Sequence, residues 1–163
     1  MRLSRLAVFA AVFAALVVVP AFAATVEVIR NGGVSLDVPA GWSKVDRAPS
    51  AITDPRTLLV VGTRGARAID SDCQVATYRV PVDGAVVVVI GWRESIGGAS
   101  ALPLSGLKLR RSTFECFAGR GAVAQVTRGG RDFQVNVMVG DKADAGTVAD
   151  ALDVARSFAL VQR

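Results

Sequence analysis

The stretch DGAVVVVIGWRE, residues 83–94, contains five consecutive branched apolar residues, Val86 to Ile90. Successive residues of a β-strand point to opposite sides, so an uninterrupted apolar run of this length is typical of a strand covered on both faces. Arg93 and Glu94 end the run. We therefore predict a central strand of a sheet here and interpret the other segments around it.

Two segments with alternating apolar residues predict β-hairpins. TVEVIRNGGVSLDVP, residues 25–39, alternates around an Asn-Gly-Gly turn, and residues 121–140 turn at Arg128-Gly129-Gly130-Arg131. In the second hairpin, one face carries Phe133, Val135, Val137 and Val139, and the other carries Gln134, Asn136 and Met138. Shorter strands are expected at residues 58–62, 73–82 and 112–117.

The C-terminal segment TVADALDVARSFAL, residues 147–160, changes to helical spacing. The apolar residues that recur at this spacing are Val148, Leu152, Ala155 and Ala159. Thr147, three residues before Asp150, resembles a helix cap. The segments together predict an α+β fold: a single antiparallel sheet of about six to eight strands with a C-terminal helix packed on it.

Residues 1–23 have the three-part pattern of a secretory signal peptide. Arg2 and Arg5 precede an uncharged apolar run, and small residues stand where a signal peptidase cuts, after Ala23 or Ala24. We expect residues 24–163 to form one globular domain outside the cytoplasm. Alternatively, the run is long enough to span a bilayer and is retained as an anchor, which would be the chain's membrane contact.

Composition argues against several classes of function. The net charge of +5 falls to +3 without Arg2 and Arg5, which is too mild to predict nucleic-acid binding. The chain has no histidine, the usual catalytic base. Residues 119–124 fit a G-x-G-x-x-A fingerprint, but a β-rich run follows where a dinucleotide site needs a helix. We expect a non-enzymatic protein without cofactor or metal.

The chain has two cysteines, Cys73 and Cys116. Export would place them in an oxidising compartment, where one intramolecular disulfide is possible. We expect this bond to tie two neighbouring segments of one sheet. The alternative, a reactive thiol, lacks a nearby histidine to activate it.

The Gly- and Ser-rich connection at residues 95–106 is the candidate contact surface, with Trp92 and Arg110-Arg111 beside it. Its expected partner is an envelope protein or a small ligand. Arginine pairs at residues 64/67, 110/111 and 128/131 could converge on an anion, or could lie in three separate solvated turns. Two further alternatives are a carboxylate-based hydrolase that uses Glu94 with Glu115, and a membrane-tethered structural component.

Five segments occur in an order that resembles a known type of protein. They are VPAGW (38–42), DPRTLLVVG (54–62), FEC (114–116), GGRDFQVNVMVG (129–140) and ADALDVARSF (149–158). This order resembles small exported proteins of GC-rich bacteria in which Pro-x-Gly-Trp opens the domain. More distantly, it is similar to the PsbP-like α/β/α sandwich of extracytoplasmic proteins and lipoproteins.

The resemblance implies an antiparallel sheet with helical cover and an accessory or binding role. It carries over no catalytic residue. The chain departs from the first group at residues 151–155, ALDVA, and it lacks the lipobox of the lipoprotein members.

Overall fold

A computed structural model describes residues 25–161, except for residues 76, 96, 98–102 and 115. The expected signal peptide lies outside the described residues. Within them, no helix is both long enough and apolar enough to cross a membrane.

The largest sheet has six antiparallel strands in the order β3-β4-β7-β10-β9-β8. Their bounds are β3 (Trp42–Lys44), β4 (Arg56–Thr63), β7 (Ala85–Gly91), β10 (Arg131–Val139), β9 (Phe117–Arg128) and β8 (Arg110–Phe114). Every residue of β7 is buried, and β4 and β10 flank it. The prediction of a central strand covered on both faces is therefore confirmed.

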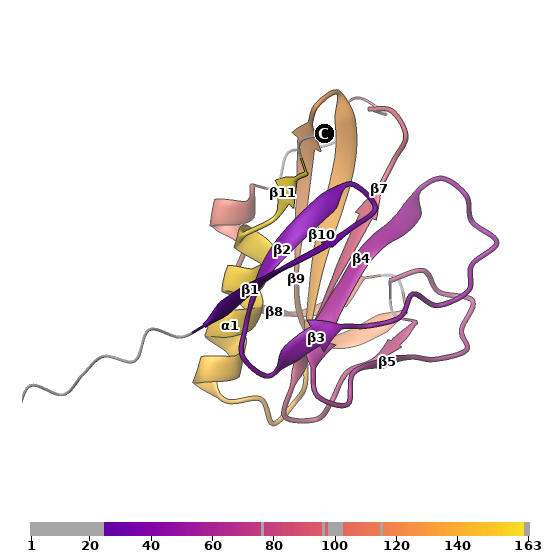
Figure 1. Cartoon of the computed structure of the whole chain (residues 1–163). Coiled ribbons are helices and arrows are strands. Elements are labelled where there is room, and N and C mark those ends of the chain that lie inside the picture. Colours follow the sequence, from indigo (N-terminus) through magenta and orange to yellow (C-terminus); the bar gives the residue numbers. More distant parts are fainter. Residues whose placement is uncertain (1–24, 76, 96, 98–102, 115, 162–163) are drawn as a thin grey trace, which may run out of the picture.

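The prediction of a single sheet is wrong, because the described strands form three sheets. The second sheet contains β1 (Val26–Asn31), β2 (Val34–Pro39) and β11 (Ala159–Leu160), and the third pairs β5 (Arg67–Ala68) with β6 (Tyr78–Arg79). Val34, Leu36 and Val38 of β2 belong to the core cluster on one face of the large sheet. The three-stranded sheet therefore lies over that face instead of adding strands to the edge of the large sheet (Figure 1).

One α-helix, α1 (Ala145–Arg156), lies beside the three-stranded sheet in the described structure (Figure 1). The carboxylate of Asp144 accepts a hydrogen bond from the Thr147 N–H at 2.7 Å, so Asp144, not Thr147, is the cap. The helix also ends at Arg156, and Ala159 belongs to β11 instead of the helix. The expected helix is confirmed, while its predicted cap and its predicted end are wrong.

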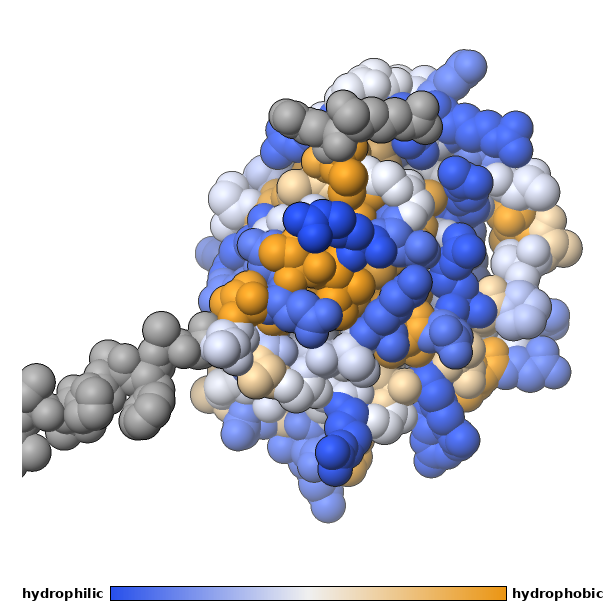
Figure 2. Space-filling view, in the orientation of Figure 1, coloured by the Kyte–Doolittle hydropathy of each residue, from blue (hydrophilic) through white to orange (hydrophobic). Residues whose placement is uncertain are grey.

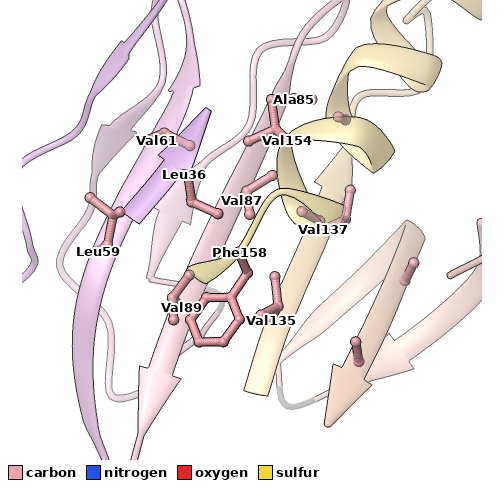
Figure 3. Close-up of a cluster of buried hydrophobic side chains, with 14 of the residues drawn as sticks. Leu36, Leu59, Val61, Ala85, Val87, Val89, Val135, Val137, Val154 and Phe158 are labelled. Atoms are coloured by element: carbon pink, nitrogen blue, oxygen red, sulfur yellow. The ribbon is translucent and has the colours of Figure 1, made fainter. Parts of the chain in front are cut away.

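The main core lies between the large sheet and the layer made by α1 and the three-stranded sheet. In Figure 3, Val87 and Val89 of β7 point toward Leu36 of β2 and toward Val154 and Phe158 near the helix end. The face predicted for the second hairpin contributes all four expected residues to this cluster. A short 3-10 helix, η1 (Leu104–Gly106), also contacts α1 and β9.

The opposite face of the large sheet has a smaller core. Val86 and Val88 of β7 pack there with Met138 and are covered by Val45 and Tyr78. The predicted strand at residues 73–82 is therefore confirmed only at β6, because most of this segment is irregular cover. The strand predicted at 58–62 lies within β4, and the one predicted at 112–117 spans the β8–β9 turn.

A disulfide joins Cys73 to Cys116, whose Cα atoms lie 6.1 Å apart. Cys73 lies in the irregular segment between β5 and β6, and Cys116 lies at the β8–β9 turn. The pairing is as expected, but the expectation that it joins two segments of one sheet is wrong. The bond fastens the cover of the second core to the edge hairpin, and it suggests an oxidising environment.

Candidate binding groove

A cavity of about 460 Å³ lies where the end of β1 approaches the β3–β4 corner. We call it the cationic groove. It is lined by Asn31 of β1, Lys44 of β3, Arg56 and Thr57 of β4, and the loop residues Asp46, Arg47, Ala48, Ser50 and Ile52. In Figure 2, apolar side chains gather over the three-stranded sheet, and hydrophilic side chains surround them.

Sheet register explains why two of the cations stand at different ends of the groove. Trp42 points into the main core, and Lys44, two residues later, leaves the same face of β3. Lys44 pairs with Val61, which lies opposite Val87, whereas Arg56 lies opposite Gly91. Val87 and Gly91 are four residues apart on β7, so Lys44 and Arg56 are separated by about 13 Å along the strand direction.

The groove has three cations, Lys44, Arg47 and Arg56, and one carboxylate, Asp46. All four side chains are exposed. In the part of the chain that the structure describes, no carboxylate lies within 4.0 Å of the charged nitrogens of the three cations. The groove therefore has more positive than negative side chains, and none of its three cations forms an ion pair with a described carboxylate.

Hydrogen bonds orient the groove walls. Arg47 Nη1 donates to the Thr57 carbonyl at 3.2 Å, and Asn31 Nδ2 donates to the Leu58 carbonyl at 2.7 Å. The Ala48 N–H donates to the Tyr78 hydroxyl at 3.3 Å, which holds the loop onto the second core. Burial raises the pKa of Tyr78, so the phenol is neutral at physiological pH.

A second hollow of about 270 Å³ adjoins the cationic groove. The two share Ala48, Ser50, Ile52 and Thr57. The far wall of the second hollow is the segment from Asp70 to Gln74, which contains the disulfide residue Cys73. Gln74 Nε2 donates to the Pro55 carbonyl at 2.7 Å, so the disulfide-bonded cover and the groove loop are joined directly.

The structure places the residues of the predicted contact surface apart. The Trp92 N–H donates to the Asp132 carbonyl, opposite Thr127, whereas exposed Arg110 lies opposite Gly121. Thr127 and Gly121 are six residues apart on β9, so Trp92 and Arg110 are separated by about 20 Å along the strand direction. Arg111, also exposed, follows Arg110 on β8.

The connection at residues 95–106 is described only in part, since residues 96 and 98–102 lie outside the described set. At its start, Ser95 Oγ donates to Asp132 Oδ2 at 3.0 Å, which fixes it to β10. Glu94 is exposed just before it. Glu115 also lies outside the described residues, so the hydrolase alternative stays a prediction.

The arginine pairs of the sequence lie in separate places. Arg64 and Arg67 follow β4, and Arg128 and Arg131 flank the β9–β10 turn at the other end of the large sheet. Sequence reasoning missed Lys44, Arg47 and Arg56. The only local signal was two cations three residues apart in a polar segment, because the groove itself arises from contacts between β1, β3 and β4.

No known family model matches the chain, and no match is found among curated proteins. The described residues also contain no group of three or more His, Cys, Asp or Glu side chains that could hold a metal ion. The groove is therefore interpreted from its own chemistry.

Proposed function

We propose that this protein is a secreted, non-enzymatic binding protein of the cell envelope and that it holds an anionic partner or ligand in the cationic groove. Export is supported by the signal-peptide pattern of residues 1–23. The Cys73–Cys116 disulfide agrees with an oxidising compartment. The resemblance to PsbP-like extracytoplasmic proteins, with its accessory role, points in the same direction.

The observation that carries the proposal is the charge of the groove. Lys44, Arg47 and Arg56 line one cavity against the single carboxylate of Asp46, and no described carboxylate forms an ion pair with any of the three cations. Arginine presents a planar fork of N–H donors that matches carboxylate or phosphate oxygens. Such exposed charges are screened by salt, so binding should weaken as ionic strength rises.

The binding test is an NMR titration with citrate, a small polycarboxylate. Backbone signals of Lys44, Arg47 and Thr57 should shift on addition of citrate and return at high salt. Arg47→Gln combined with Arg56→Gln should weaken binding by about tenfold or more, since two charged contacts are lost. Arg64→Gln is a control for charge removal outside the groove, because Arg64 is exposed and does not line the groove.

The proposal of an anionic ligand would be overturned if citrate shifted no groove signal, or if Arg64→Gln weakened binding as much as the groove variants. Export is tested separately by the intact mass of the full-length chain expressed with its leader. Loss of residues 1–23 or 1–24 supports secretion. An intact N-terminus would instead support the membrane-tethered alternative.

A further inference from the structure

Strand β1 has a free edge beside the cationic groove. In the three-stranded sheet the order is β1-β2-β11, so β1 pairs with β2 on one side, and no described strand pairs with its other side. Four of its six residues are exposed, including Val26 at 61%. A free edge carries a row of backbone N–H and C=O groups that can pair with another extended chain.

The groove begins where this edge ends. Asn31, the last residue of β1, is part of the groove wall, and its Nδ2 donates to the Leu58 carbonyl of β4, which lies between the sheet levels of Arg56 and Lys44. Glu27, the acidic residue of β1, lies near the opposite end of the strand. A strand that pairs with β1 near Asn31 would therefore reach the levels of both cations at the end of β1 that lies away from Glu27, and Asp46 is the one carboxylate of the groove wall there.

The spacing of the cations selects an extended ligand over a compact one. The sheet levels of Lys44 and Arg56 are separated by four strand residues. In an extended chain, residues i and i+4 point to the same side and lie about 13 Å apart. Two acidic side chains four residues apart in an extended chain can therefore reach Lys44 and Arg56 at the same time. A compact anion can contact only one of the two cations.

From this geometry we propose that the groove binds an extended acidic segment of a partner protein, which adds a strand to the free edge of β1 and directs alternate carboxylates at Lys44 and Arg56. The inference rests on the proposed anion binding and names its ligand class. Main-chain hydrogen bonds to β1 supply affinity, and the cations supply preference for acidic side chains.

The test uses synthetic peptides that share one sequence and differ in backbone methylation. The first has about ten residues with Glu and Val alternating, so that one face is acidic when the peptide is extended. The second carries N-methyl groups on alternate backbone nitrogens, which removes strand hydrogen bonds on one edge but keeps every charge. Methylated versions in both phases are used, so that each edge of the peptide is blocked once.

We expect the unmethylated peptide to bind and to slow hydrogen exchange of the exposed β1 amides. Blocking the pairing edge should weaken affinity by about tenfold or more. Lys44→Gln with Arg56→Gln should weaken binding of the unmethylated peptide, while Arg64→Gln should leave it unchanged. A peptide with Lys in place of Glu should bind far more weakly.

Each contrary result is informative. Equal binding of the unmethylated peptide and both methylated peptides would overturn strand addition. Citrate binding without any peptide binding would also overturn it. In both cases the proposed anion binding would survive. Failure of citrate and peptide alike would overturn the proposed function itself. Equal affinity for the Lys and Glu peptides would overturn the preference for acidic segments.

Discussion

The rings of Phe133 and Phe158 lie against each other, with centroids 5.3 Å apart and planes tilted by 50°. Phe133 belongs to β10, and Phe158 stands between the end of α1 and the start of β11. The guanidinium of Arg131 lies 5.1 Å from the centroid of the Phe133 ring. This pair therefore joins the large sheet to the point where the helix meets the three-stranded sheet.

Replacing Phe158 by alanine should lower the free energy of unfolding by about 3–5 kcal/mol, because it removes a buried ring and leaves a cavity at this junction. Phe158→Leu should cost clearly less, since it keeps most of the buried volume. Urea denaturation followed by circular dichroism measures both. A loss of less than about 1 kcal/mol in Phe158→Ala would show that the junction does not depend on the ring.

The strands that were predicted well have their signal in adjacent residues. The apolar run of β7 specified a strand buried on both faces, and Gly129 and Gly130 specified the β9–β10 turn, where both adopt positive φ. The first hairpin was also predicted from alternation. Alternation shows which face of β2 is buried but not which surface covers it, so a separate sheet could not be distinguished from an extension of the large one.

The features that were missed depend on tertiary contacts. The segment around Cys73 has the composition of a strand, yet it forms irregular cover held by the disulfide and by Gln74. The helix cap was misplaced because Asp144 and Thr147 both suit a cap, and the structure uses the earlier one. The cationic groove joins residues from β1, β3 and β4, whose proximity no local pattern specifies.

Removing the disulfide should lower the free energy of unfolding by about 4 kcal/mol on the chain-entropy model, given the 43-residue separation of the cysteines. The double variant Cys73→Ser with Cys116→Ser avoids a leftover thiol and is compared with the oxidised protein in urea. Amides of Thr77 and Tyr78 should lose protection from hydrogen exchange first, because their segment is fastened by this bond. Unchanged stability in the double variant would contradict this role.

The buried amide of Asn136 allows the stability cost of an unpaired hydrogen-bond donor to be measured. It is fully buried, and its Nδ2 has no hydrogen-bond partner among the described residues, although its Oδ1 accepts from Gln134 at 2.8 Å. An unsatisfied buried donor costs about 1–3 kcal/mol. Asn136→Leu has similar size and should raise the free energy of unfolding by about 1 kcal/mol, since half-buried Gln134 can turn to water.

Asn136→Asp is the companion variant for this site. It keeps the shape of the side chain but buries a carboxylate on the face of the large sheet that has the smaller core. It should therefore destabilise the protein at neutral pH and do so less in acid, where the carboxylate is protonated. Thermal melts of both variants give the comparison. A clear loss of stability in Asn136→Leu would mean that Nδ2 makes a bond in solution, such as one to an ordered water.

Tyr78 should make stability depend on pH in the alkaline range. Burial is the largest influence on its hydroxyl and raises its pKa above the ordinary value of 10.0, outweighing the hydrogen bond from Ala48. The unfolded chain therefore loses this proton first. Its contribution to stability is fully present below pH 10.0 and is lost as pH rises through the folded pKa.

Because Tyr78 is the single tyrosine of the chain, its tyrosinate absorbance reports this residue alone. The titration midpoint should lie above that of the urea-unfolded protein. Tyr78→Phe should remove the part of the alkaline loss of stability that this group causes. Equal midpoints for folded and unfolded protein would show that burial does not outweigh the hydrogen bond from Ala48, and the expected dependence of stability on alkaline pH would then be wrong.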